Sequence, residues 1–487
     1  MSTGRRFALQ RYGTWEWLDY EAPLFTNDGP EWARNAYGIM NAEIPSPVVY
    51  RMIADDGRPM FEEWSTFVHV EIDDPGSKRR IWTGIIAEAT LTGAGWKLVV
   101  LEHPGYLKGE PYQGLIRGVR EDPAVLARQL VNDMQAWPNA WYGCTVVGST
   151  PVRIGSDLDD RIAAARAAMD ARRKTLDSFT KSKAKSTLGM QDADTTLADE
   201  VAQSRLLVEQ AKSLILQLER AGAPAEQIAQ ARQTLTLRQA EAKQTLAAYN
   251  TELAAGRAAV ASARRNKDDA QKAYDSAKAA YDALTDQRRV GEGAYVIDGD
   301  DLPDAYSALQ DLCRTAGIEW TTTTQYTEGA PALSIVMHYP RAGGRRDDLV
   351  FDTAVNIIGA LELDRLEYAN AAVGIGAGEG AAAVRSVVDT PTLRMRRTIE
   401  VENKAARTKA QITARMREAL AATSGELFPT QIEVRDHPNC RIGAWQVGDI
   451  VQVDGVTTIG TRWSGLARID SWSWPSPNRA RLQLVPA

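Results

Sequence analysis

Four glycines recur at every second position of the run VGIGAGEGAAAV, residues 373 to 384. Loops that bind the pyrophosphate of a dinucleotide follow the spacing G-x-G-x-x-G, which lets backbone amides approach the phosphates. Here Gly374, Gly376, Gly378 and Gly380 are spaced by two throughout, and position 379 is Glu. A spacing of two suits an extended strand whose one face lies flat against another backbone. The run therefore predicts a closely packed strand and not a cofactor site.

Aspartates gather in the segment IDGDDLPD, which contains Asp298, Asp300, Asp301 and Asp304. Carboxylates are the ligands that Ca²⁺ prefers, but a calcium loop also needs a closing glutamate at a fixed distance, and none follows. Aspartate also favours turns and helix N-termini, where its side chain accepts backbone N–H groups. We therefore expect a turn followed by a helix cap.

The remaining residues capable of acid–base or metal chemistry are scattered. None of the four histidines (His69, His103, His338 and His437) lies in a metal-binding or triad motif. His437 and Cys440, in DHPNC, are two ligands where a structural zinc ion needs four. There is no G-x-S-x-G and no Gly-Lys dipeptide, which a phosphate loop requires. We predict no catalytic, cofactor-binding or metal-binding residues and no enzymatic activity, with a carboxylate hydrolase as the alternative.

Composition limits the class of protein further. The 487 residues carry a formal net charge of −6 and are 44% hydrophobic, enough for two to four domains. This mild acidity argues against a general nucleic-acid binder. Three widely spaced cysteines, Cys144, Cys313 and Cys440, do not form a disulfide framework and indicate a reducing compartment. We expect no secretory signal and no membrane-spanning segment, because long apolar runs are missing.

The elements that would position these residues change character abruptly between 156 and 290. All thirteen tryptophans lie outside this window, which has a single proline, Pro224. From residue 246 onward its sequence repeats every seven residues, as in a coiled coil, with alanines in the apolar seam. The predicted a positions are Leu246, Leu253, Val260, Lys267, Tyr274 and Tyr281, and the d positions are Tyr249, Gly256, Ala263, Ala270, Ala277 and Leu284. A single solvated helix is the alternative.

A turn divides the helical window at its midpoint. The segment AGAP, residues 221 to 224, places Gly222 where a helix ends with positive φ and Pro224 near the first turn of the next. Two arms of equal length bring both ends of a hairpin back together. We predict an antiparallel coiled-coil hairpin over 156–290, with its tip at 221–224. Gly189, followed by Asp192 and Asp194, predicts a break that divides the first arm into two helices.

The flanks predict strands and three short helices. Alternating apolar residues indicate strands at 67–72, 81–91, 96–102, 447–453, 465–474 and 479–485, and further strands follow 317. Helices are expected at 122–136, 301–317 and 402–422. The predicted fold is a multidomain α+β chain with β-rich, barrel-like domains at 1–110 and 371–487. An α/β domain split between 111–155 and 291–370 lies between them, interrupted by the hairpin.

The order of these segments resembles that of minor tail proteins of long-tailed bacteriophages, of the baseplate-hub or tail-associated type. The resemblance covers about 350 residues, all but 156–290, and rests on NAYGIMNAEIP (35–45), IWTGIIAEATLTGAGWKLVVLEHPGYL (81–107), DLCRTAGIEW (311–320), VGIGAGEG (373–380), WQVGDIVQVDG (445–455) and ARIDSWSW (467–474). The hairpin departs from the pattern of the family.

The resemblance implies a structural virion protein at the tail tip, assembled in the host cytoplasm. It implies a homotrimer that closes the tail tube and takes part in attachment and genome ejection. The implied partners are the distal tail protein, the tape measure protein and tip or fibre proteins, with possible contact with the host cell envelope and no specific nucleic-acid binding. No cofactor is expected. The alternatives are a cell-wall-degrading tail enzyme and a free coiled-coil adaptor or adhesin.

Overall fold

The computed structural model describes residues 5–45, 53–72, 80–288, 293–327, 330–376, 383–403, 406 and 409–487. The chain forms two compact units. Met1–Leu158 together with Arg288–Ala487 form one, called here the β-rich unit, and Asp159–Gln287 form the other, called the helical unit. No helix in the described ranges is long and apolar enough to cross a membrane. The predicted domain boundaries stay a prediction.

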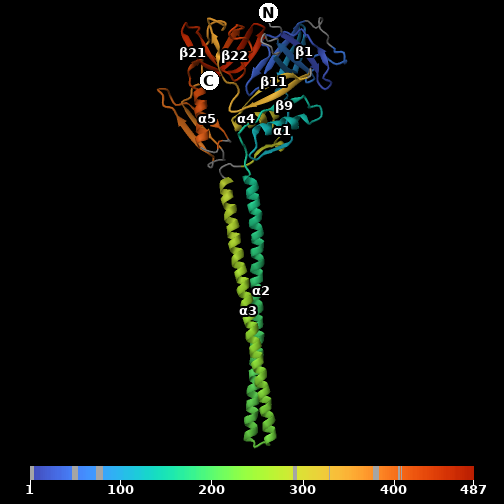
Figure 1. The fold of residues 1–487 in the computed structure, drawn as a ribbon, viewed down its shortest axis with the longest axis vertical. Helices are drawn as coiled ribbons and strands as arrows, with labels where there is room; N and C mark the ends of the chain where they lie inside the picture. The colour runs from blue at the N-terminus through green and yellow to red at the C-terminus, as the bar shows by residue number, and fades with distance from the viewer. Residues whose placement is uncertain are drawn as a thin grey trace. The chain divides into compact units, whose positions relative to one another are not determined.

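The first sheet of the β-rich unit has the strand order β2-β1-β5-β6-β11-β12-β9, with β7 beside β6 and β4 beside β7. Figure 1 labels its strands β1, β9 and β11. Its strands are β1 (Arg5–Arg11), β2 (Trp17–Asp19), β4 (Ile39–Pro45), β5 (Thr66–Ile72), β6 (Arg80–Thr92), β7 (Gly95–Glu102), β9 (Cys144–Val147), β11 (Glu319–Thr327) and β12 (Ala330–His338). Its pairs are antiparallel except β12 with β9. The sheet is open and not the predicted barrel, because β6 continues to β11 and β12 instead of returning to β1.

Two capped helices and a small β-ribbon complete this part of the unit. In α1 (Pro123–Gln135) the carboxylate of Asp122 accepts the amide of Ala124 at 3.0 Å, as predicted. Helix α4 (Ala305–Ala316) is capped by Asp304 and ends at Gly317, with φ of 65°. The ribbon pairs β8 (Leu115–Gly118) with β10 (Tyr295–Asp298), and the 3₁₀ helices η1 (His103–Leu107) and η2 (Gly299–Asp301) flank it in sequence. Both helices share one apolar core with β9, β11 and β12.

The second sheet has the order β13-β20-β21-β22-β19, with β3 paired to β21. Its strands are β3 (Glu31–Ala33), β13 (Arg345–Asp352), β19 (Gln431–Arg435), β20 (Ile450–Val456), β21 (Arg462–Ser476) and β22 (Arg479–Pro486). The β3–β21 pair brings Trp32 onto Trp472, with stacked rings 4.3 Å apart. One apolar core runs through the N-terminal and C-terminal strands together. This sheet is open as well, so it too differs from a closed barrel.

A small sheet, β16-β15-β17, contains the first residues of the glycine-rich run, Val373 to Ile375. Its strands are β15 (Ala371–Ile375), β16 (Arg385–Asp389) and β17 (Thr398–Glu402), and the nearby β14 (Asp364–Arg365) pairs with β18 (Leu427–Phe428). Helix α5 (Lys409–Ala422) packs on it and is shorter than the predicted 402–422, because Glu402 still belongs to β17. A Cβ at Gly374 would lie 2.5 Å from Ile412 of α5, and one at Gly376 would lie 2.4 Å from the Ala406 carbonyl oxygen. These two glycines permit close packing, as predicted. Gly378 and Gly380 lie outside the described residues.

The helical unit is a hairpin of α2 (Leu158–Arg220) and α3 (Ala225–Arg288). Gly222, at the turn, has φ of +67°. Contacts between the arms fix their antiparallel pairing, since Arg232 bonds Glu219 at 2.9 Å and Tyr249 donates to Asp194 at 2.8 Å. At 1.5 Å per residue each arm extends ~95 Å. The predicted hairpin and its turn are confirmed.

The predicted seam also matches the packing of α3. Eleven of the twelve predicted a and d positions are buried or half-buried, and Leu246 is exposed. Gly256 leaves room for the side chain of Met190 from the other arm, since a Cβ at this glycine would lie 3.0 Å from the Met190 Cγ. The break predicted at Gly189 is wrong, because α2 is continuous from Leu158 to Arg220. A single glycine costs a helix interior only about 1 kcal/mol, too little to end one that packs along a partner arm.

Candidate functional site

The residues that the sequence singled out for chemistry serve the fold. Asp298 accepts the amide of Asp300 at 3.0 Å, and Asp304 accepts that of Ser307 at 2.8 Å, so the aspartate cluster forms the predicted turn and cap. Cys440 is buried, and its amide donates to the carbonyl oxygen of His437 at 2.9 Å. Across the described ranges, no group of three or more His, Cys, Asp or Glu side chains is placed to hold a metal ion.

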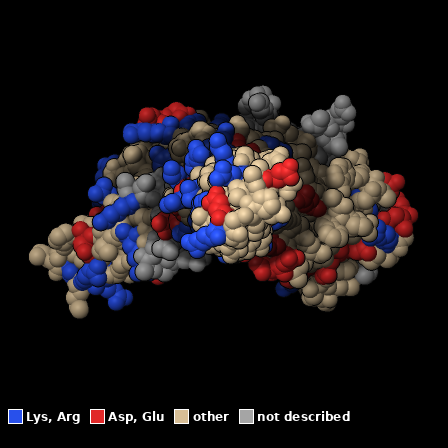
Figure 2. All heavy atoms as spheres, turned by 90° about the horizontal axis from the view of Figure 1, so that it is seen from below, with Lys and Arg blue, Asp and Glu red and all other residues tan. Residues whose placement is uncertain are grey.

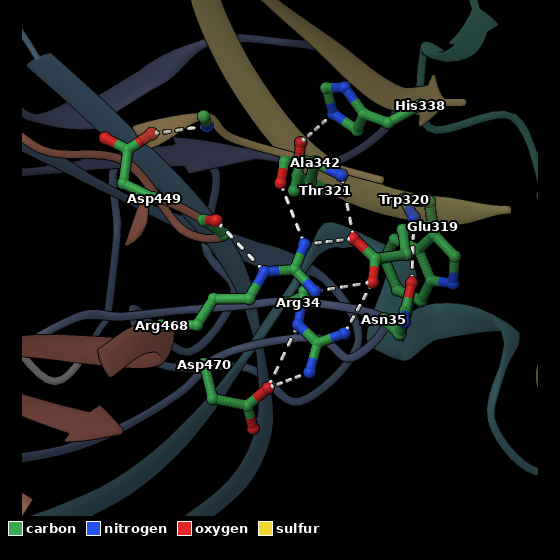
Figure 3. Close-up of polar contacts among 12 residues, drawn as sticks. Arg34, Asn35, Glu319, Trp320, Thr321, His338, Ala342, Asp449, Arg468 and Asp470 are labelled. Atoms are coloured by element: carbon green, nitrogen blue, oxygen red, sulfur yellow. Dashed lines mark hydrogen bonds and ion pairs between the residues drawn. The ribbon is translucent and has the colours of Figure 1, made fainter. Parts of the chain in front are cut away.

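An extended polar cluster lies where three remote segments of the β-rich unit meet (Figure 3). Glu319 lies at the start of β11. Its carboxylate accepts a hydrogen bond from Arg34 at 2.7 Å and two from Arg468 at 2.9 and 2.5 Å. Arg34 follows β3 and also bonds Asp470 of β21, at 3.0 and 2.5 Å. Residues more than 430 positions apart in sequence are thereby joined. We call Arg34, Glu319, Arg468 and Asp470 the four-residue network.

Backbone groups form further hydrogen bonds with this network. Arg468 donates to the carbonyl oxygens of Gly448 and Ala342 at 3.0 and 2.8 Å, and Glu319 accepts the amide of Ala342 at 2.7 Å. Beside it, Asn35 exchanges two hydrogen bonds with the backbone of Trp320, at 2.8 and 2.9 Å. Asn35 has φ of 53°, a conformation that asparagine tolerates better than most residues. The side chain of Asn35 thus extends the contact between the β3 segment and β11.

The electrostatics of the network favour the charged forms. Burial raises the pKa of Glu319, but hydrogen bonds from Arg468 and Ala342 and the charge of Arg34 outweigh it and hold the pKa below its ordinary value. Burial likewise opposes the charge on Arg34, while Asp470 and Glu319 raise its pKa. An ionised carboxylate that already accepts several donors is a poor general base. The arrangement is suited to holding segments together, not to proton transfer.

A fully buried carboxylate, Glu102, ends β7 in the same unit. It accepts the amide of Gly38 at 2.8 Å and a hydrogen bond from the hydroxyl of Thr322. Burial raises its pKa to about 8, against the opposing effect of these two donors. The neighbouring His103 is also buried, which lowers its pKa to about 4 and keeps the ring neutral at pH 7. Both groups lie inside the protein and tie β7 and η1 to β11 and β12.

Two hollows in the β-rich unit offer little for catalysis. One, of about 270 Å³, is open and is lined mainly by polar residues of β3, β4, β21 and β22 and of the segment before β3, where Arg481 lies 3.5 Å from Asp28. The other, of about 30 Å³, is lined mainly by aromatic rings with His103 and Tyr142. That volume accommodates one or two water molecules. Neither gathers a nucleophile and a base.

Sequence reasoning missed the four-residue network altogether. Its members lie in four unremarkable positions, and the segment GLARIDSWSW gives only a weak signal, namely the charged Arg468 among alternating apolar residues. Pairing of β3 with β21 is a long-range event that no local pattern encodes.

No protein-family model matches the chain, and no curated protein matches it. Among solved structures it is similar to the 43 kDa tail protein of prophage MuSo2 from Shewanella oneidensis, with a TM-score of 0.44 and 10% identity over 99% of this chain and 98% of that one. It is also similar to prophage tail protein gp18 from Listeria monocytogenes EGD-e, with a TM-score of 0.42 and 6% identity over 99% and 94% of the two chains. At these TM-scores the likeness does not establish a common fold.

Proposed function

We propose that this chain is a structural component of a bacteriophage tail, located at the tail tip or baseplate hub. The observation that carries the proposal is the four-residue network, with the β3–β21 pair beside it. In these contacts, charged side chains bond one another and so join the N-terminal, middle and C-terminal segments. Contacts that join remote segments in this way support a structural role.

The tail-tip location rests on the resemblance in segment order described above. On that basis the chain assembles as a homotrimer in the host cytoplasm and closes the distal end of the tail tube. Its neighbours are the distal tail protein, the tape measure protein and tip or fibre proteins. Its role is attachment and genome delivery, without enzymatic activity.

Particle imaging tests this proposal directly. A gold label on the C-terminus of the chain is expected at the tip of purified tails, and mass measurement of the assembled ring is expected to give three copies. A chain that stays monomeric in every preparation and is absent from purified particles would contradict the proposal. Zymography of the purified chain on host cell-wall material is expected to show no cleavage.

A further inference from the structure

The loop between β16 and β17 displays two apolar side chains in an unusual way. Every residue from Pro391 to Thr398, in the sequence PTLRMRRT, is exposed. Leu393 is fully exposed and Met395 is 87% exposed, more than any other large apolar side chain in the described part of the chain. Isolated apolar side chains at the surface are common, but two at alternate positions of one protruding loop need a reason.

This loop is held in place at both ends. Buried Asn370 accepts the amide of Arg397 at 2.8 Å through Oδ1 and donates to the Thr392 hydroxyl at 3.0 Å through Nδ2. Its backbone carbonyl accepts the amide of Thr390 at 2.8 Å, and its own amide donates to the Arg397 carbonyl at 3.1 Å. The Tyr368 hydroxyl lies 2.7 Å from that of Thr392. A loop fixed in this way loses little conformational entropy on binding.

Two arginines of the loop contact residues close to its base. Arg394 lies over the ring of Tyr368, 4.8 Å from its centroid. Arg396 bonds Asp389 at 2.9 Å. Both arginine residues remain exposed, so they can still meet an anionic surface.

The surrounding segment is strongly basic in an acidic chain. Residues 385–417 contain nine Lys and Arg against three Asp and Glu, a net charge of +6, whereas the whole chain carries −6. Figure 2 shows lysine and arginine side chains recurring over the left-hand part of the molecule, where α5 and its sheet lie in Figure 1. The basic residues described there include Arg385, Arg394, Arg396, Arg397, Lys409 and Arg417, all exposed.

We propose that the 391–398 loop binds an anionic lipid surface, with Leu393 and Met395 inserted among the headgroups and the arginines of the segment at the phosphates. Protruding apolar side chains flanked by basic ones suit the interfacial region of a bilayer. An acidic protein is the less suitable occupant, because the core of a protein interface needs a contiguous apolar patch. Here the residues on either side of Leu393 and Met395 are polar or charged. This inference is independent of the tail-tip location.

Vesicle sedimentation with the purified full-length chain tests the proposal. The chain is expected to sediment with vesicles that contain phosphatidylglycerol and not with phosphatidylcholine alone, and added salt should weaken the binding. Replacing both apolar side chains (L393S with M395S) should weaken binding at least about tenfold, because each buries its side chain in the bilayer. Arg397→Gln should weaken it about fivefold.

Ile459→Ser is the matched control, since Ile459 is 76% exposed but lies outside the basic segment, and it should leave vesicle binding unchanged. The substituted side chains are exposed, so each variant should keep the circular dichroism spectrum and melting temperature of the parent. Wild-type binding that does not depend on phosphatidylglycerol, or full binding by the double variant, would overturn the proposal. Binding to poly-L-glutamate without binding to vesicles would overturn it in favour of an acidic protein partner.

Discussion

At the scale of single residues, the β-rich unit depends on a few charged side chains at junctions between segments. Glu319 is the centre of these contacts, because it is the one acceptor shared by Arg34 and Arg468 within the four-residue network. Buried ion pairs add little when intact, but removing one partner leaves an uncompensated charge. The network is therefore a place where one substitution has a large effect.

Glu319→Ala is expected to destabilise the chain by about 3 kcal/mol, the lower end for a broken buried pair, because Glu319 and Arg34 keep some exposure. Urea unfolding followed by tryptophan fluorescence measures this loss. Asp347→Ala, which removes the exposed partner of Arg345, is the control and should leave the unfolding midpoint unchanged. An equal loss in the two variants would show that the network has no special role.

Glu102 predicts that stability falls as the pH rises from about 4.5 to about 8. Its folded pKa of about 8 exceeds the ordinary 4.5, so the unfolded chain loses this proton first as the pH rises. Stability from this group is complete below pH 4.5 and is lost as the pH rises to about 8, by an amount on the order of a few kcal/mol.

Glu102→Gln should abolish this loss, because the side-chain amide does not ionise in this pH range and its oxygen can still accept the hydrogen bond from the Gly38 amide. Its melting temperature should exceed that of the wild type at pH 9 and not at pH 5. Glu21→Gln, at an exposed carboxylate, is the control and should melt like the wild type at both pH values. Parallel melting curves for Glu102→Gln and the wild type across this range would contradict the assigned shift.

At the scale of elements, local patterns predicted the helices and many of the strands. The caps at Asp122 and Gly317 marked the start of α1 and the end of α4, because capping chemistry is contained in a few neighbouring residues. The start of α4 was predicted too early, at 301, because Asp304 caps the helix and Gly299–Asp301 form a separate 3₁₀ turn. The seven-residue repeat identified the seam of α3 for the same reason. Gly256 and Lys267 are the residues least typical of a seam, yet both are half-buried in it. The side chain of Met190 occupies the space beside Gly256.

Local patterns were insufficient where the outcome depended on remote partners. The first sheet did not close into a barrel because β6 pairs with β11, across hundreds of residues, and the second is open because its edge strands β13 and β19 do not pair with each other. The network around Glu319 depends on those same pairings and could not be predicted for that reason. Gly189 gave a false break because its helix gains more from packing along the other arm than one glycine costs.

Two glycines of the hairpin therefore predict opposite effects. Gly189 lies inside α2 with nothing within 4 Å of an added Cβ, so Gly189→Ala should stabilise the hairpin by about 0.5–1 kcal/mol. Gly222 also has open space but has φ of +67°, so Gly222→Ala should destabilise it by about 1 kcal/mol. Thermal unfolding followed by the helical circular dichroism signal measures both. A stabilising effect at Gly222 would mean that the turn is not in the left-handed conformation.

At the scale of the whole molecule, the chain combines two units with separate cores. Neither of the two apolar core clusters of the β-rich unit contains a residue between 159 and 287. The strands of this unit come from the parts of the sequence before and after the hairpin. Its stability should therefore depend on residues outside the hairpin, although the hairpin interrupts it in sequence.

Replacing Asp159–Gln287 by a short Gly/Ser linker should leave the β-rich unit folded. The chain segments on either side of the hairpin already meet, because the amide of Ser156 donates to the carbonyl oxygen of Gly293 at 2.9 Å. A few flexible residues span such a gap at a small loop-closure cost. All thirteen tryptophans remain in the deletion protein, so near-ultraviolet circular dichroism reports directly on its packing.

This deletion protein should unfold in one cooperative thermal transition with an unchanged tryptophan signal. If the hairpin braces or extends toward another component, particles that carry the deletion should assemble poorly or lose infectivity while the purified chain stays soluble. The continuous seam of α3 and the cross-arm bonds of Arg232 and Tyr249 give the hairpin a structure of its own, so the separated segment 157–289 should be helical. An insoluble deletion protein, or one without a cooperative transition, would show that the β-rich unit needs the hairpin to fold.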